Sequence, residues 1–134
     1  MKDVRLLYFS QNDDVRGHMV VVESLQHVPF EIKRVFYCYG TEYTAVRGRH
    51  SNRRSEFVMV CVAGSCKVLV KDGKGNEEEY CLDKPAVGLY LPKLVWKEMY
   101  DFSEDCVLLV LSSDHYDSDE YIRDYEQLVQ YMSD

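Results

Sequence analysis

The stretch that decides the fold is residues 47–64, which reads RGRHSNRRSEFVMVCVAG. Its first half is polar and cationic, whereas residues 57–62 are apolar at every position. Because side chains of a strand alternate between two faces, an unbroken apolar run predicts a strand covered on both faces, at a sandwich centre or a subunit interface. In the polar half, an extended backbone would place His50 and Asn52 on the same face of the sheet.

Short runs rich in Val, Tyr, Phe and Leu continue on both sides of this stretch as far as residue 112. Turn residues separate them at roughly ten-residue spacing, a pattern typical of an antiparallel sandwich or barrel. After Ser118 the apolar residues recur at helical spacing, and Ser118 itself is a suitable N-cap. We therefore expect one domain over 1–134, all-β in 1–112, with a single carboxyl-terminal helix over about 118–132.

The charge balance restricts the possible partners. Sixteen Lys and Arg against 23 Asp and Glu give a net charge of −7, which argues against binding to nucleic acid or to a membrane surface. No signal-peptide pattern and no membrane-spanning apolar run is present, so a cytoplasmic protein is expected. An anionic ligand would need a local cluster of cations, and four arginines occur at positions 47, 49, 53 and 54. We interpret the last three as a solvated rim.

The chain has five cysteines, an odd number, and no C-x-x-C pair. Most of them lie inside apolar, strand-like runs. This usage predicts buried, reduced thiols in preference to disulfides or a zinc site.

Seven short motifs follow one another along the chain: DVRG at 14–17, IKRV at 32–35, RGRH at 47–50, GSC at 64–66, PAVGLY at 85–90, WKEM at 96–99 and YIR at 121–123. In this order they resemble the cupin-type dTDP-sugar 3,4-ketoisomerases, and the resemblance covers nearly the whole chain. The resemblance implies a small cupin-type jelly-roll β-barrel and a homodimer in which strands are exchanged. It also implies a dTDP-linked 4-keto-6-deoxyhexose as substrate, no cofactor, and transfer of the keto group from C4 to C3.

One position departs from the family pattern, which has His-x-His where this chain has His50-Ser51-Asn52. Metal-binding cupins also place a histidine where Lys97 stands here. An ammonium group repels a divalent cation, and Asn52 and Glu56 leave too few good ligands, so we expect no metal site.

The residues that remain suit proton transfer. Moving a ketone along a sugar requires removal of a proton next to the carbonyl and stabilisation of an enediolate. His50 is the candidate base, because a neutral imidazole is available near pH 7. Lys97 and Arg16 could stabilise the developing negative charge. Asn52 could orient the imidazole or bind a sugar oxygen but cannot carry a proton, so a water, Tyr37 or His50 itself would deliver the second one.

Binding of a nucleotide diphosphate calls for planar, bidentate donors, and Arg47 and Arg34 are the first candidates. Trp96 or Tyr37 could stack on the thymine or the sugar, although Trp96 could equally be core packing. Strand alternation puts Arg34 and Tyr37 on opposite faces, so a regular strand cannot direct both into one cavity. Lys97 and Trp96 are consecutive residues, so in a regular strand they too would point to opposite faces.

Three functions remain open at this stage. The first is the 3,4-ketoisomerase, and the second is a 3- or 5-epimerase of the same substrate class, which begins with the same proton abstraction. The third is a nucleotide-sugar-binding protein without turnover, which the replacement by Asn52 would favour.

Overall fold

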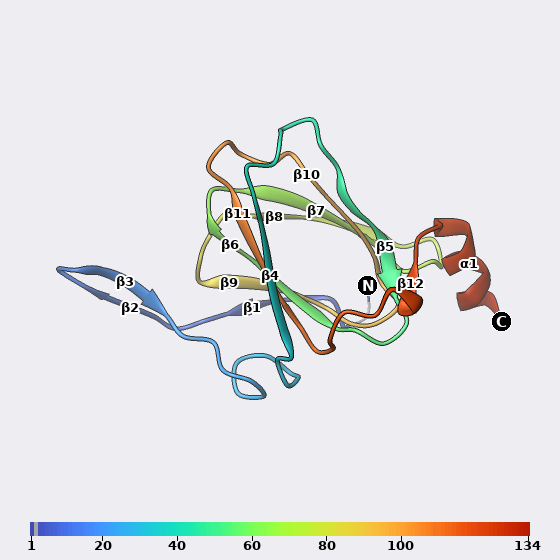
Figure 1. The fold of residues 1–134 in the computed structure, drawn as a ribbon, viewed down its shortest axis with the longest axis horizontal. Coiled ribbons are helices and arrows are strands. Elements are labelled where there is room, and N and C mark those ends of the chain that lie inside the picture. Colours follow the sequence, from blue (N-terminus) through green and yellow to red (C-terminus); the bar gives the residue numbers. More distant parts are fainter. Residues whose placement is uncertain (2) are drawn as a thin grey trace.

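Two five-stranded antiparallel sheets face each other in the computed structural model, which describes Met1 and residues 3–134 (Figure 1). The strand order is β1-β9-β6-β11-β4 in the first sheet and β12-β5-β10-β7-β8 in the second. The strands are β1 (Arg5–Tyr8), β2 (Gln11–Asp14), β3 (Gly17–Val20), β4 (Arg34–Tyr39), β5 (Arg47–Asn52), β6 (Phe57–Ala63), β7 (Cys66–Lys71), β8 (Glu77–Leu82), β9 (Val87–Leu91), β10 (Trp96–Tyr100), β11 (Val107–Ser112) and β12 (Tyr121–Ile122). The expectation of a mostly β fold with one carboxyl-terminal helix, α1 (Tyr125–Ser133), is confirmed.

Strand β6, the apolar half of the opening stretch, is covered on both faces. One face, with Phe57 and Met59, packs in the core between the two sheets. The other face, with Val58 and Val60, packs against the segment that links β3 to β4. The prediction from the sequence is therefore correct along most of the strand, but Val62 at its end is 42 % exposed.

The core between the sheets follows from strand alternation. Inward-facing residues of β6, β9 and β11 meet those of β7 and β10 in one apolar cluster. The registers keep this alternation aligned across the sheets: Phe57 pairs with Ser112 on β11 and with Leu91 on β9, and Lys97 pairs with Val70 on β7. Buried polar side chains lie at the ends of these strands, where Ser112 pairs with Phe57 and where Lys97 begins the inward-facing side of β10.

The segment after β11 differs from the prediction. Ser118–Glu120 form a short 3-10 helix, η1, and the chain then extends as β12, where Tyr121 pairs with Asn52 of β5. Helix α1 begins only at Tyr125, and the side chain of Asp124, not Ser118, caps it. Pairing with β5 satisfies the backbone of residues 121–122 and buries Ile122, and this tertiary gain outweighs the helical pattern of the local sequence.

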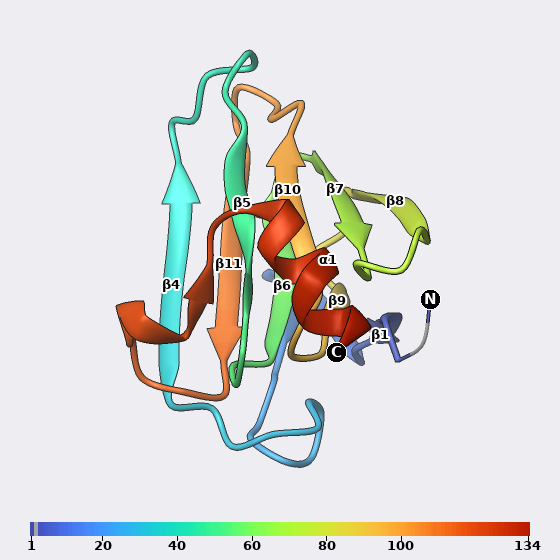
Figure 2. The same ribbon diagram turned by 90° about the vertical axis from the view of Figure 1, so that its right-hand side faces the viewer.

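Helix α1 lies beside β5 and β12 at one end of the molecule (Figures 1 and 2). Leu128 is fully buried, and the ring of Tyr125 packs edge-on against Trp96 with a centroid separation of 5.5 Å. The helix therefore covers the outer face of β10, the face opposite to the barrel interior.

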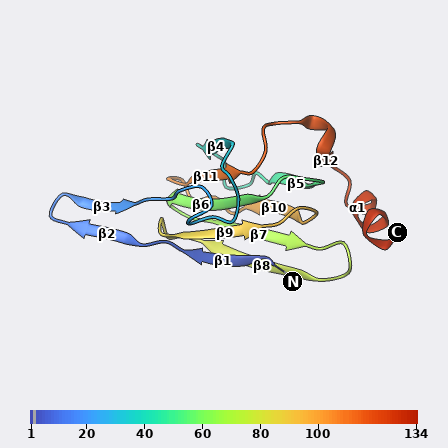
Figure 3. The same cartoon turned by 90° about the horizontal axis from the view of Figure 1, so that it is seen from below.

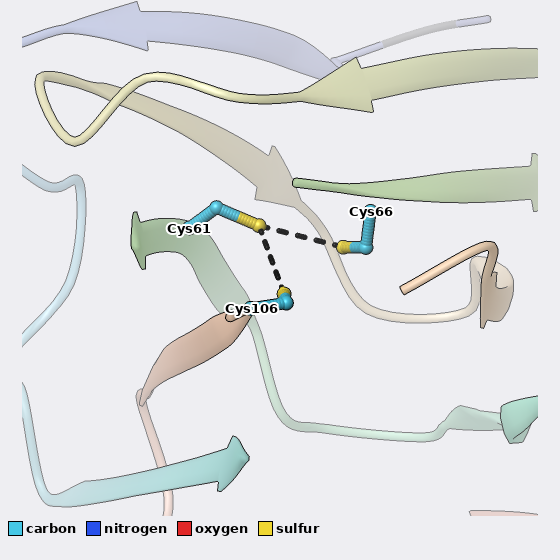
Figure 4. A group of neighbouring side chains, drawn as sticks. All are labelled: Cys61, Cys66 and Cys106. Atoms are coloured by element: carbon cyan, nitrogen blue, oxygen red, sulfur yellow. Dashed lines mark hydrogen bonds between the residues drawn. The ribbon is translucent and has the colours of Figure 1, made fainter. Parts of the chain in front are cut away.

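Three of the five cysteines form a buried group, which we call the thiol cluster: Cys61, Cys66 and Cys106 (Figure 4). The Sγ atom of Cys61 lies 3.5 Å from that of Cys66 and 3.8 Å from that of Cys106, and all three thiols are free. Burial raises the pKa of Cys106 to about 12, and the hydrogen bond with Cys66 together with burial raises the pKa of Cys61. The prediction of buried, reduced thiols is correct for this cluster but wrong for Cys81, which is exposed.

Strands β2 and β3 form a two-stranded hairpin, which we call the arm, and it projects from the barrel at the end opposite to α1 (Figures 1 and 3). All four residues of β2 are exposed. Within the described part of the chain, no helix has the length and apolar character needed to cross a bilayer.

Candidate active site

A bulge in β5 sets the position of His50. Lys97 of β10 pairs with His50, but the next residue, Glu98, pairs with Gly48, so Arg49 is an extra residue in β5. Such a bulge bends the strand and re-aims the neighbouring side chains. Gly48 has a φ of +85°, and a Cβ atom there would lie 2.9 Å from the carbonyl oxygen of Lys97. Only glycine fits this close approach without strain.

The imidazole of His50 is held on both sides. Its Nδ1 atom lies 3.1 Å from the carbonyl oxygen of Gly48, and its ring centre lies 4.7 Å from that of Tyr121. Because a carbonyl can only accept, we assign the ring proton to Nδ1, which leaves Nε2 free as an acceptor. Burial, helped by the positive charge of Lys97, lowers the pKa of His50 to about 4. The ring is therefore neutral at pH 7.

Lys97 faces the same side of the sheet as its pairing partner His50, and it is only 2 % exposed. Its Nζ atom lies 3.1 Å from Oδ1 of Asn52 and 4.5 Å above the ring centre of Phe57. Among the described residues, no carboxylate lies within 4.0 Å of this ammonium group. Burial lowers the pKa of Lys97 to about 7, against the opposing effect of the negative charge on Glu120.

Asn52 is fully buried, and its amide is only half used. Its Oδ1 atom accepts from Lys97, but its Nδ2 atom has no hydrogen-bond partner in the described part of the chain. A buried donor without a partner costs free energy, so such groups in a polar cluster are typical of ligand contacts.

Glu120 is the buried anion of this region, and it is 1 % exposed. It accepts hydrogen bonds from the backbone nitrogens of Arg54 and Ser55, at 2.9 and 2.8 Å, and from the hydroxyl of Ser55. Although burial raises the pKa of Glu120, these hydrogen bonds outweigh it and hold the pKa below its usual value. The carboxylate thus fastens η1 to the turn that follows β5.

Arg34 extends the same cluster from the other sheet. Its Nη2 atom donates to the hydroxyl of Ser112 at 3.2 Å, whereas its buried Nε atom has no partner in the described part of the chain. The guanidinium lies 5.6 Å from the ring centre of Tyr116, and that ring lies 5.8 Å from the ring of Tyr121. A chain of aromatic contacts therefore connects Arg34 to His50.

Two residues proposed from the sequence lie on the wrong face. Tyr37 is 60 % exposed on the outer face of β4, where it stacks on Tyr39 at 6.4 Å. Trp96 is buried under α1, and its Nε1 atom donates to Glu98 at 2.9 Å. In both strands a cation, Arg34 or Lys97, lies on the inner face, so Tyr37 and Trp96 do not face His50 within this chain, and their roles in the site remain predictions.

Two further candidates are not in contact with His50. Arg16 lies at the tip of the arm, bonds Asp14 at 2.6 Å, and has a side chain that is 87 % exposed. Arg47 is exposed at the start of β5. The arginines interpreted as a rim do bind acidic or carbonyl groups: Arg49 pairs with Glu98, Arg54 with Asp114 and Asp117, and Arg53 donates to the carbonyl of Asp119.

The sequence prediction missed Tyr121 and Glu120, because it placed residues 118–132 in a helix, and it missed Tyr116 in the preceding segment. The residue types gave no clear strand signal, because two acidic residues are followed by two apolar ones; the alternation of buried Glu120 and Ile122 with the more accessible Asp119 and Tyr121 is a property of the structure. The partner strand of such a segment, however, could not be deduced from its own residues.

Two facing antiparallel sheets define a cupin-type barrel, and a largely buried histidine and a buried lysine lie side by side at one end of its core, where they can support proton transfer. The comparisons with known proteins agree: residues 2–133 match the model of the family described as "FdtA: WxcM-like, C-terminal", and the chain belongs to this family.

Relatives about 40 % identical to this chain include 3,4-ketoisomerases from three bacteria. The chain is 44 % identical over 129 residues to a TDP-4-oxo-6-deoxy-α-D-glucose-3,4-oxoisomerase of Aneurinibacillus thermoaerophilus, covering 96 % of this chain and 92 % of that protein. It is 39 % identical to the 3,4-ketoisomerase QdtA of Thermoanaerobacterium thermosaccharolyticum, solved as a histidine-to-asparagine variant in complex with TDP-4-keto-6-deoxyglucose, with a TM-score of 0.95 and coverage of 98 % and 94 %. It is 41 % identical to the TDP-quinovose 3,4-ketoisomerase WlaRB of Campylobacter jejuni, with a TM-score of 0.93 and coverage of 97 % and 99 %.

Proposed function

We propose that this protein is a 3,4-ketoisomerase that converts a TDP-linked 4-keto-6-deoxyhexose into the 3-keto sugar. The observation that carries the proposal is the buried pair formed by His50 and Lys97: a neutral imidazole with one free nitrogen beside an ammonium group without an ion-pair partner among the described residues. The ligand-bound relative, a 3,4-ketoisomerase, holds TDP-4-keto-6-deoxyglucose. The substrate class is taken from that similarity.

The reaction begins at C3 of the sugar. Nε2 of His50 removes the proton from C3, and the electron pair of the C–H bond forms the C3=C4 double bond while the C4 carbonyl oxygen becomes an oxyanion. Lys97 supplies positive charge to that oxyanion inside a site from which water is largely excluded, where a preorganised charge is most effective. Nδ2 of Asn52 is a free donor for a sugar oxygen.

The diphosphate requires a cation at the edge of the same cluster. Arg34 is suited to this role, because its Nε atom is buried and has no partner in the described part of the chain, and a guanidinium binds phosphate through two parallel hydrogen bonds. Arg47, exposed three residues before His50, remains the second candidate.

The function can be tested by incubating the protein with TDP-4-keto-6-deoxyglucose in deuterated water and following the sugar by NMR. The isomerase is expected to give a 3-keto product with deuterium at C4. Deuterium confined to C3 or C5 with the ketone still at C4 would indicate an epimerase instead. Binding of TDP by calorimetry without any exchange at carbon would indicate a binding protein, and either result contradicts the proposal.

We further propose that the protein is a homodimer joined through the outer face of the first sheet. Val35, Tyr37 and Tyr39 leave an exposed apolar surface on β4, next to an apolar cavity of about 820 Å³ lined in part by Val20 and Val62. The arm beside it is a two-stranded hairpin, an element of marginal stability when isolated in water. A second copy would cover this face and bind the arm, so that Arg16 contacts the partner copy.

Analytical ultracentrifugation tests the dimer. The wild type is expected to sediment as a dimer at micromolar concentration, and Tyr37→Asp is expected to sediment as a folded monomer. Tyr131→Asp, at an exposed tyrosine on α1, is the matched control and should remain dimeric. A monomeric wild type would refute this interface.

A further inference from the structure

The second proton transfer of the reaction requires a group that the sequence pattern does not supply. Asn52 cannot carry a proton, and Tyr37 lies on the outer face of β4, so the remaining sources of the second proton are a water, His50 itself and Lys97. We propose that Lys97 is this group: its ammonium protonates C4 of the enediolate after His50 has removed the proton from C3. This inference rests on the proposed ketoisomerase function and adds to it a second acid/base residue.

The hydrogen bonds of Lys97 leave it free to act as a donor. An ammonium group has three N–H bonds, and the structure gives Nζ one acceptor, Oδ1 of Asn52. The ring of Phe57 contacts the cation on one side without consuming a donor in a directed bond. Glu120, the nearby anion, is already occupied by the nitrogens of Arg54 and Ser55 and by the Ser55 hydroxyl. Nζ therefore keeps N–H bonds that can be directed at a substrate.

His50 and Lys97 are suited to opposite proton transfers, because one can accept a proton and the other can donate one. Nδ1 of His50 donates to Gly48, so the nitrogen that remains free can only accept a proton. The free positions on Lys97 can only donate while it is an ammonium group. Since the two residues are direct pairing partners on β5 and β10, their side chains approach the same substrate from neighbouring strands. Geometry thus assigns His50 as the base and Lys97 as the acid.

The step balances within the two residues and the substrate. The C3–H bond breaks and the proton passes to His50; an N–H bond of Lys97 then breaks and a C4–H bond forms. The C3 hydroxyl proton moves to the oxygen on C4, so that C3 is oxidised and C4 is reduced without an external electron carrier. The turnover ends with a protonated His50 and a neutral Lys97 amine.

Proton return from His50 to Lys97 restores the starting state. The pKa of Lys97, lowered by burial to about 7, lies above the pKa of His50, so this return is downhill. The charged groups that influence the pair are Glu120 in η1, which raises both pKa values, and Arg123 after β12, which lowers that of His50. Asn52 acts as a positioning residue that fixes Nζ.

Four variants separate proton transfer from simple charge stabilisation. Lys97→Met removes both the charge and the hydrogen bond to Oδ1 of Asn52. Lys97→Arg keeps the charge but cannot release a proton, because guanidinium stays protonated in proteins. Lys97→His restores a group that exchanges protons near pH 7. His50→Asn removes the base. Thermal unfolding and calorimetry with TDP verify that each variant is folded and binds the nucleotide.

The readouts are loss of the C3 proton of TDP-4-keto-6-deoxyglucose to deuterated water and formation of the 3-keto product. Lys97→Arg, which keeps the positive charge beside the C4 oxyanion, is expected to exchange C3 within about tenfold of the wild-type rate, while its product formation falls about 100-fold or more, the usual contribution of one acid/base group. Lys97→Met, which removes the charge as well as the proton, is expected to lose both. Lys97→His is expected to regain at least about tenfold over Lys97→Met. His50→Asn is expected to lose both.

Other outcomes overturn the inference. Full product formation by Lys97→Arg would mean that Lys97 acts only as a fixed charge, and loss of C3 exchange in Lys97→Arg would place its action at the first step. C3 exchange that persists in His50→Asn would remove His50 as the base. An inactive wild type that still binds TDP would instead contradict the ketoisomerase function itself, so the two failures are distinguishable.

Discussion

Replacing Glu120 by Gln tests whether one buried carboxylate joins the β5 turn to the carboxyl-terminal segment. The substitution keeps the shape but removes the charge. Two backbone hydrogen bonds, from Arg54 and Ser55, lose their charge assistance, and the contact with the Ser55 hydroxyl must reverse its donor. Hydrogen bonds to a charged group contribute about 1 kcal/mol more than neutral ones, so the loss should be about 2–3 kcal/mol.

Urea denaturation followed by tryptophan fluorescence measures this loss, because Trp96 is the single tryptophan and packs against α1. The midpoint should fall by about 1–2 M urea at pH 7. Glu104→Gln, the same change at an exposed position, should leave the midpoint unchanged. The pKa of Glu120 is lower in the folded state, so its stabilisation is present above pH 4.5 and is lost as the pH falls through the folded-state pKa. The two proteins should therefore converge in acid.

The reasoning would be refuted by a Glu120→Gln variant whose free energy of unfolding at pH 7 lies within about 0.5 kcal/mol of the Glu104→Gln control, the range of ordinary surface substitutions. A difference that persisted unchanged at low pH would also contradict it, because a protonated Glu120 differs little from Gln. Either result would mean that β12 and η1 are held in place by the packing of Ile122 alone.

Three further predictions concern the strand bulge, the reaction and the thiols. Gly48→Ala should destabilise the fold by about 2 kcal/mol or more in urea unfolding and reduce turnover, whereas Gly75→Ala, also at positive φ but in open space, should cost only about 1 kcal/mol. Turnover should rise as the pH increases through about 4, where His50 becomes neutral, and fall above about 7, where Lys97 loses its proton; a stopped-flow pH profile checks this, and a flat profile from pH 6 to 9 contradicts it. A thiol reagent such as DTNB should modify Cys81 rapidly in the folded protein and the thiol cluster only after unfolding.

Much of the fold was predictable because it depends on short-range patterns. The two-residue alternation of the strands and the apolar run at 57–62 identified an all-β sandwich with β6 inside it. The order of the motifs, together with RGRH at 47–50, identified the ketoisomerase family and singled out His50.

Other features were decided only by the tertiary structure, because they join residues distant in sequence. Alternation correctly separated Lys97 from Trp96, and Arg34 from Tyr37, but it cannot tell which face of a strand is the inner one. In the structure α1 packs on the face of β10 that carries Trp96 and buries this residue, so that face is the outer one and Lys97 points to the interior. The helix in turn starts late because residues 121–122 pair with β5, which lies about seventy positions earlier in the chain.

The opening stretch by itself predicted a β fold and identified His50 as the candidate base. The sequence could not show that Lys97 and Asn52 would meet as a buried amine and its acceptor, 3.1 Å apart. Burial lowers the pKa of Lys97 to about 7 and so makes its ammonium group a stronger acid than an exposed lysine. That burial is a property of the assembled barrel, because it requires residues from several strands around Lys97.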